Sequence, residues 1–223
     1  MYDTVAEITQ LVKDKESELS TLRQQMEDDF DLLILTPYEA KDATGKKRKG
    51  YQTYTSSEPR NFFDKVLDGL NRAVLTVRIE LPENASEKDR RKGSNGELFL
   101  FGSLEMIDRR LRIMGEPPLR ESLGFFMSAR GIGAMRALVY QPAKSKDVVF
   151  DVMSWDPLHV TWESGSDGLL WAANKRWATR EQILAEYDVD FVGKNLEVID
   201  FWDTEGNAVI INNQFVKEPT AHG

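Results

Sequence analysis

Residues 196–212 read LEVIDFWDTEGNAVIIN, two apolar segments separated by a polar turn. Residues 196–203 and 208–212 are rich in β-branched and aromatic side chains, which favour extended chain. The Glu-Gly-Asn sequence at 205–207 supplies residue types that are common in tight turns. This stretch therefore predicts two consecutive antiparallel strands.

The same texture extends upstream through the rest of the carboxyl-terminal half. Four more segments have the composition of strands, at residues 132–140, 148–153, 158–163 and 169–177. The turn signals between them are Gln141-Pro142, Asp156-Pro157 and the glycine-flanked residues 165–168. One helix interrupts the series, because Thr179 and Gln182 have the spacing of a capping box. Short strands joined by tight turns predict an antiparallel sheet.

The first 35 residues predict one long helix. Thr4 and Glu7 again have capping-box spacing. An apolar stripe with intervals of three and four residues follows, interrupted once by Lys15, and consists of Val5, Ile8, Val12, Leu19, Leu22 and Met26. Two interpretations of this stripe stay open: the helix packs on its own domain, or it lies against a neighbouring subunit.

The middle of the chain predicts three more helices and one strand. A helix starts near Pro59, and its apolar face, which we expect to pack on a core, contains Phe62, Phe63, Val66, Leu67 and Leu70. Residues 74–81 alternate as a strand does and stop at Pro82. Residues 85–115 are helical in pattern, with an interruption at 93–96, and a short helix follows at 119–130. Gly131 is expected to cap that helix, with tight packing at Gly133.

The organisation is helices first and strands afterwards, which predicts an α+β fold. Amino-terminal helices are followed by a mainly antiparallel, strand-rich half with one inserted helix. We expect a helical part at residues 1–131, with a polar loop at 38–57, and a strand-rich part at residues 132–223.

Composition limits the classes of function. The 223 residues carry a net charge of −8, which argues against a protein that grips duplex nucleic acid over a broad surface. We therefore expect weak binding to duplex DNA at moderate salt. The chain has no cysteine and no apolar run of membrane-spanning length, and its first residues do not resemble a secretory signal. The expected location is the cytoplasm, with a virion as the special case.

The residue patterns of known catalytic sites are not found. The two histidines, His159 and His222, are far apart and lack zinc-ligand spacing. The sequence at 163–167 is not a nucleophile elbow. Gly131 and Gly133 follow a predicted helix and precede a predicted strand, which inverts the order of a dinucleotide fingerprint. We therefore expect no enzyme activity and no catalytic, cofactor or metal site.

A metal-dependent nuclease is the alternative kept open by the aspartates. Four of them lie on or beside predicted strands: Asp147, Asp151, Asp156 and Asp200. Strand ends and turns also select aspartate for local hydrogen bonding, so these positions have a structural interpretation as well.

Other side chains favour packing and assembly. All five tryptophans lie in the strand-rich half, where large rings stabilise a compact sheet or a subunit contact: Trp155, Trp162, Trp171, Trp177 and Trp202. Arg109, Arg110 and Arg112 could pair with acidic groups of another chain, or form a solvated helix flank. The basic residues 46–49 are expected at a solvated loop tip, and a nucleic-acid contact there is the alternative.

The ordered pattern of these segments resembles the portal proteins of tailed bacteriophages of the siphovirus type. The similarity lies in residues 54–60 and the helix after them, the two helices up to Arg130, and the strand at 133–140. It continues in the strand, Asp-Pro and strand sequence of 150–160, the strand at 168–176 with the helix from Thr179, and the Val-Ile-Asp-Phe-Trp run at 198–202. Residues 217–223 resemble the stretch before a Gly-x-x-Pro motif.

The resemblance implies a structural protein of the virion, present in the host cytoplasm during assembly. Such a protein forms a homo-oligomeric ring, typically of twelve subunits, at one capsid vertex. Double-stranded DNA passes through its channel during packaging and ejection without sequence-specific binding. The implied partners are the major capsid protein, the terminase and the head-completion or adaptor protein.

The resemblance is to the amino-terminal wing region alone. Portals carry stem and clip segments after such strands, and these 223 residues have neither. The resemblance therefore implies a truncated portal wing, either the wing portion of a longer protein or a truncated gene product. Another virion or adaptor protein with an unrelated sheet is the second alternative beside the nuclease.

Overall fold

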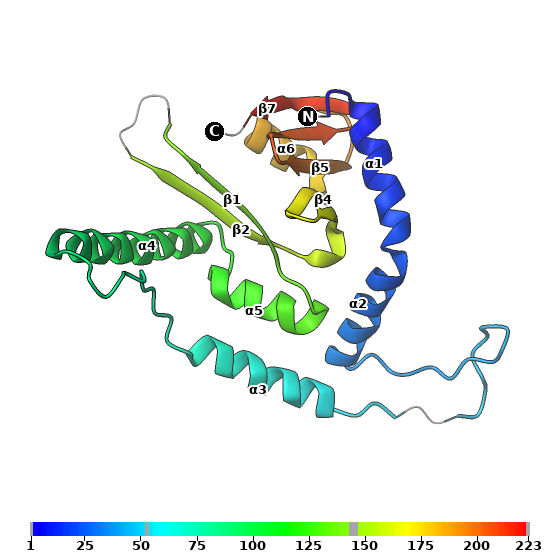
Figure 1. The fold of residues 1–223 in the computed structure, drawn as a ribbon. Coiled ribbons are helices and arrows are strands. Elements are labelled where there is room, and N and C mark those ends of the chain that lie inside the picture. Colours follow the sequence, from blue (N-terminus) through cyan, green and yellow to red (C-terminus); the bar gives the residue numbers. More distant parts are fainter. Residues whose placement is uncertain (1, 52–53, 143–146, 222–223) are drawn as a thin grey trace. The chain divides into compact units, whose positions relative to one another are not determined.

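The computed structural model describes residues 2–51, 54–142 and 147–221 (Figure 1). Over these residues it contains six α-helices and seven strands in two antiparallel sheets, so the predicted α+β fold is confirmed. The helices are α1 (Val5–Glu18), α2 (Ser20–Leu33), α3 (Glu58–Arg72), α4 (Glu87–Ile113), α5 (Leu119–Arg130) and α6 (Arg180–Tyr187), with a short 3-10 helix at Pro157–His159. The strands are β1 (Ala134–Tyr140), β2 (Val149–Trp155), β3 (Val160–Gly165), β4 (Gly168–Thr179), β5 (Asn195–Asp203), β6 (Gly206–Ile211) and β7 (Gln214–Ala221).

The chain divides into two compact units. The sheet unit contains Met1–Asp28 together with Trp155–Gly223, and the helical unit contains Asp29–Ser154. Helices give way to strands after Gly131, but the sheet unit also includes the first helix from the start of the chain. The two units are described separately below.

Five strands of the sheet unit form one antiparallel sheet in the order β3-β4-β5-β6-β7. The pairing is regular in its centre, where Phe201 lies opposite Ala208 and Val198 lies opposite Ile211. Each strand pairs with its neighbour in sequence, because tight turns bring consecutive strands together.

Both faces of this sheet carry a buried apolar cluster, which explains the almost continuous apolar sequence of β5 and β6. On one face, Ile8 and Val12 of α1 pack with sheet residues that include Phe201 and Trp171. The second cluster contains Ile183 of α6 together with Ala178, Leu196, Val198, Val209 and Ile211. Consecutive side chains of a strand point to opposite faces, so a sheet covered on both sides needs apolar residues at nearly every position.

The last strand, β7, is absent from the sequence-based expectation. Asn212 and Asn213 precede it, and both have positive φ values, 51° and 58°. Two consecutive residues in this region form the turn that suits a two-residue hairpin, and asparagine tolerates it better than other non-glycine residues. The Asn-Asn pair followed by Phe215 and Val216 was therefore a usable hairpin signal.

The amino-terminal helical segment is split at Leu19 into α1 and α2, which corrects the prediction of one long helix. The Ser20 hydroxyl donates to the carbonyl of Ser17 at 2.8 Å, and such side chain–backbone bonds disturb helix geometry. The capping box of Thr4 and Glu7 is confirmed, with both reciprocal hydrogen bonds present. Burial of Ile8 and Val12 against the sheet supports the interpretation that α1 packs on its own domain.

Lys15, which interrupts the apolar stripe, forms ion pairs through its side chain. Its ammonium group pairs with Glu163 of β3 and with Glu18. The hydrogen bond from Lys15 holds the pKa of Glu163 below its ordinary value. Arg23 of α2 adds a donor to the Thr161 hydroxyl at 2.8 Å. These polar contacts fix the direction of α1 and α2 along the edge strand β3.

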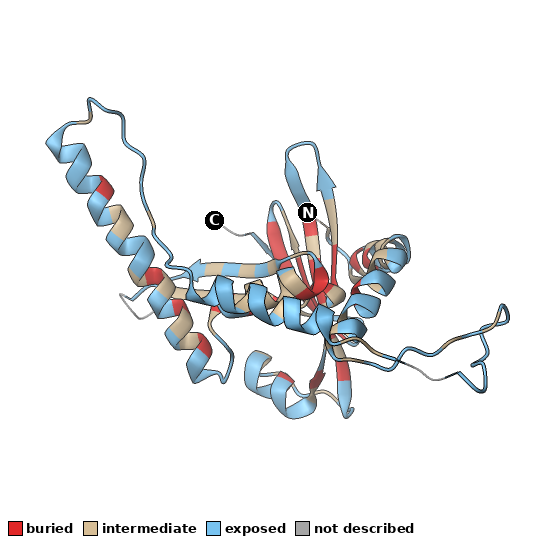
Figure 2. Ribbon diagram, turned by 90° about the horizontal axis from the view of Figure 1, so that it is seen from below, coloured by how far each residue is buried: buried red, intermediate tan, exposed pale blue. Residues whose placement is uncertain are grey.

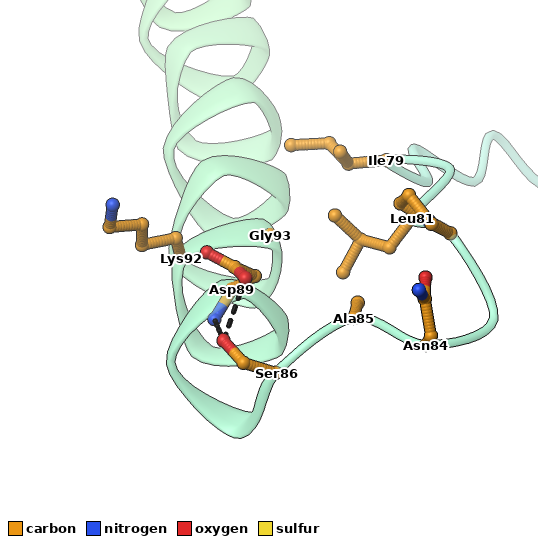
Figure 3. Close-up of a pocket in the computed structure, with 9 residues that line it drawn as sticks. Ile79, Leu81, Asn84, Ala85, Ser86, Asp89, Lys92 and Gly93 are labelled. Atoms are coloured by element: carbon orange, nitrogen blue, oxygen red, sulfur yellow. Dashed lines mark hydrogen bonds between the residues drawn. The ribbon is translucent and has the colours of Figure 1, made fainter.

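The strand predicted at residues 74–81 is wrong. This segment, with the turn that follows it to residue 85, forms an extended strap that pairs with no strand in the described part of the chain. Its alternating side chains face a helix instead: Ile79 and Leu81 point toward α4 (Figure 3). The backbone N–H of Ile79 donates to the Glu97 carboxylate at 2.9 Å, which takes the place of a ladder hydrogen bond.

The predicted interruption of α4 at 93–96 is also wrong, because the helix runs unbroken from Glu87 to Ile113. Two of its glycines, Gly93 and Gly96, lie against the strap. A Cβ atom at Gly93 would lie 3.0 Å from Leu81, and one at Gly96 would lie 2.6 Å from Ile79. Two glycines one turn apart thus make room for the strap, at a cost of about 0.5–1 kcal/mol each relative to alanine.

The predicted helix cap at Gly131, the tight packing at Gly133 and the capping box at Thr179 are confirmed. Gly131 caps α5 with φ 76° and ψ −7°, and a Cβ atom at Gly133 would lie 2.8 Å from Met127. Thr179 caps α6 with a complete capping box.

We expect Ile8→Ala to destabilise the sheet unit by about 2–5 kcal/mol, because the side chain is fully buried and its loss leaves a cavity. All five tryptophans lie in this unit, so urea unfolding followed by tryptophan fluorescence reports on it directly. Lys13→Ala, at an exposed position of the same helix, is the control and should change the midpoint little. Equal midpoints for the two variants would contradict the packing of α1 on the sheet.

Candidate interaction surface

The two units differ sharply in how they distribute apolar side chains. Of the 22 buried apolar residues in the described chain, 17 lie in the sheet unit and five in the helical unit. Large exposed apolar residues show the reverse pattern, with 24 of 29 in the helical unit. The helical unit is the longer of the two, so size cannot explain its small core.

The small core of the helical unit lies between α4, α5 and β2. It contains Ile107, Leu111, Leu119 and Val152, with Phe150 and a few other side chains packed around it. Beside it, the Asp151 carboxylate accepts from Arg136 at 2.7 Å and lies 3.5 Å from Arg110. One carboxylate therefore ties β2 to both β1 and α4.

Four consecutive residues of α4, Leu98, Phe99, Leu100 and Phe101, leave 44–69% of their surface exposed. We call them the apolar belt. Most of the surface of α4 is exposed in Figure 2. An α-helix turns by about 100° per residue, so four consecutive side chains point around most of its circumference. Phe99 contacts Phe150 with ring centroids 5.9 Å apart, but the belt as a whole is not covered by its own unit.

Helix α3 has the same character. Phe63 packs edge-on against Phe125 of α5 with centroids 5.5 Å apart, and Leu67 approaches Gly124. The rest of the predicted apolar face is exposed: Phe62 by 71%, Leu70 by 44% and Val66 by 37%. The helix therefore has no fully buried residue, and the predicted packing on a core is realised along one edge of the face.

An open pocket of about 630 Å³ lies between the strap and the first turns of α4 (Figure 3). Two of its polar residues, Ser86 and Asp89, form the cap of α4. The Ser86 hydroxyl donates to the Asp89 carboxylate at 2.6 Å and accepts from the Asp89 N–H at 3.2 Å. Lys92 points away from the strap. Because Ser86 and Asp89 bond to each other and Lys92 points away, these three residues do not converge on one position in the pocket.

The sheet unit has one prominent exposed aromatic residue. Trp155 and Trp171 are buried and Trp162 and Trp202 are half-buried, whereas Trp177 is 66% exposed. Next to it, Arg176 contacts Glu186 and Tyr187, and burial is the main cause that raises the pKa of Tyr187 to about 12. Packing thus accounts for two of the five predicted aromatic positions and leaves Trp177 available for contact.

Three of the four aspartates considered as metal ligands have structural roles. Asp151 pairs with Arg110 and Arg136, Asp156 accepts from the Leu158 N–H at 3.0 Å, and Asp200 accepts from the Trp202 indole at 2.7 Å. In the portion of the chain that the structure describes, no group of three or more His, Asp or Glu residues could hold a metal ion. His222 lies outside that portion. The geometry therefore lends the nuclease alternative no support.

The arginines of α4 separate into two kinds. Arg110 is paired with Asp151 inside the helical unit, so its acidic partner lies in the same chain and neither predicted interpretation, another chain or a solvated flank, describes it. Arg109 and Arg112 line an open hollow with Glu105 and Ile113 at the end of the helix. These two, together with 79% exposed Ile113, extend the exposed surface of α4 beyond the apolar belt.

Comparison with the known protein families finds none that matches this chain, and a search of the curated proteins finds no match either. Among the helices that the structure describes, none is long and apolar enough to cross a membrane.

Replacing Asp151 by alanine should destabilise the helical unit by about 2 kcal/mol, since it removes the charged hydrogen bond from Arg136 and the ion pair with Arg110. Hydrogen exchange of the α4 and β1 amides measures this loss. The exchange should be the same with and without Mg²⁺. Protection of the wild-type protein by Mg²⁺ that disappears in Asp151→Ala would contradict the structural role and favour a metal site.

Proposed function

We propose that this chain is a structural subunit of the portal type, which assembles with copies of itself into a ring at a capsid vertex. The proposal rests on one observation: in the helical unit, most large apolar side chains are exposed and few are buried. The exposed side chains include the four consecutive residues of the apolar belt, and large exposed apolar patches mark protein contacts.

The geometry of the apolar belt favours two partners over one. A single flat interface covers one side of a helix, whereas the belt exposes side chains around most of α4. A subunit in a cyclic assembly contacts a neighbour on each side through different surfaces, which is the heterologous arrangement that closes into rings. This agrees with the order of helices and strands that resembles a portal wing.

In this proposal the chain performs no chemistry of its own. The ring would hold the capsid vertex, and duplex DNA would pass through its channel during packaging and ejection. The major capsid protein, the terminase and the head-completion protein would dock on its outer surfaces. Large contact surfaces rather than a preorganised pocket suit such work.

Mass photometry and negative-stain electron microscopy test the proposal with one pair of variants. The wild-type protein should form closed particles of uniform mass. Leu98→Ser combined with Phe101→Ser should weaken assembly by roughly 100-fold or more, since two large apolar side chains per copy then stay unburied.

The matched control is Leu169→Ser combined with Val192→Ser, which changes two exposed apolar residues of the sheet unit. It should assemble as the wild type does. A wild-type protein that stays monomeric at high concentration and cleaves DNA in the presence of a divalent metal would overturn the proposal.

A further inference from the structure

The polar loop after α2 carries a small ordered hairpin, residues 38–51, with an unusual charge. It contains five cationic side chains, Lys41, Lys46, Lys47, Arg48 and Lys49, and two anionic ones, Glu39 and Asp42. Its net charge is therefore +3 within a chain of net charge −8. A local positive site on an acidic protein selects for a polyanionic partner.

Backbone bonds give the tip a defined shape. Lys41 and Lys47 form an antiparallel bridge, and the Arg48 N–H donates to the Ala40 carbonyl at 2.8 Å. The Asp42 carboxylate accepts from the Thr44 N–H at 2.8 Å and from the Lys46 N–H at 3.0 Å. Gly45 supplies the positive φ of 80° that the turn requires. The hairpin is thus held before any partner binds.

Both acidic residues of the hairpin are engaged internally. Asp42 closes the turn, and its hydrogen bonds, first the one from the Thr44 hydroxyl, hold its pKa below the ordinary value. Glu39 pairs with Lys47. Among the described residues, no carboxylate lies within ion-pair distance of Lys46, Arg48 or Lys49, and all three are exposed. Three cations therefore face solvent together.

The same hairpin carries two exposed tyrosines. Tyr38 is 71% exposed and Tyr51 is 62% exposed. The Arg48 guanidinium lies 5.9 Å from the centre of the Tyr51 ring, so charge and aromatic surface adjoin. Aromatic rings beside lysine and arginine are the combination on which unpaired bases stack while the cations hold the phosphates.

We propose that this hairpin binds single-stranded nucleic acid. Duplex DNA offers phosphates but keeps its bases stacked inside, so it would use the cations and leave the tyrosines without a role. An acidic protein surface would likewise need the charges alone. The hairpin has no aliphatic residue larger than alanine at positions 38–51, which disfavours a membrane surface.

The test uses fluorescence anisotropy with a labelled thymidine oligomer of about 12 nucleotides, a length within the usual site sizes. Affinity for the single strand should exceed that for the matching duplex. With three phosphate contacts, the logarithm of affinity should fall with the logarithm of salt concentration with a slope of about −2. Binding should therefore be measurable at low salt and weak at moderate salt.

Two variants of the intact chain separate the contributions. Lys46→Ala, Arg48→Ala and Lys49→Ala combined should reduce the salt slope toward zero and weaken binding roughly tenfold or more. Tyr38→Ala with Tyr51→Ala should weaken single-strand binding by roughly tenfold while keeping the slope, because the charges are unchanged. All changed side chains are exposed, and circular dichroism checks that the fold is kept.

The matched control removes three positive charges elsewhere, at the exposed positions Lys13, Lys65 and Lys88, each replaced by alanine. It should bind as the wild type does. The proposal is overturned if the control loses as much affinity as the hairpin variant, or if the wild type does not bind at low salt. Equal binding of duplex and single strand that ignores the tyrosines would also overturn it. None of these outcomes depends on whether the chain assembles into rings.

Discussion

Four consecutive large apolar side chains on a helix need apolar neighbours on several sides, and the helical unit does not provide them for the apolar belt of α4. Its own core uses one stripe of the helix, through Ile107 and Leu111. In the apolar belt, Leu100 lies on the same side of the helix as that stripe, whereas Leu98, Phe99 and Phe101 point in other directions. Large exposed apolar patches mark protein contacts, so this imbalance is the basis of the proposed assembly.

The two units thus differ in how much of their apolar surface they bury themselves. The sheet unit is self-sufficient: both faces of its sheet are covered, and ion pairs along β3 fix α1 and α2. The helical unit depends on a small core and on the Asp151 ion pairs, and it presents α3 and α4 outward. In the proposed assembly, neighbouring copies would cover the apolar surface that the helical unit exposes.

Sequence reasoning was most successful where one local pattern determined the structure. The two capping boxes, the cap at Gly131 and the strands around 196–212 all follow from short-range chemistry. It failed at residues 74–81, because alternation cannot distinguish a strand partner from the glycine-lined side of α4. The exposure of the apolar belt could not be predicted either, because a run of four apolar residues is equally typical of a buried segment.

Thiol accessibility tests the burial of the apolar belt most directly, because the chain has no cysteine of its own. Leu98→Cys provides one reactive thiol in the belt, and Val192→Cys provides one at a position that is 97% exposed. In dilute protein, we expect maleimide to react with both thiols at similar rates. At concentrations where the protein assembles, we expect the reaction at position 98 to be at least tenfold slower than at position 192. Equal rates at both positions in the assembled particle would contradict this expectation.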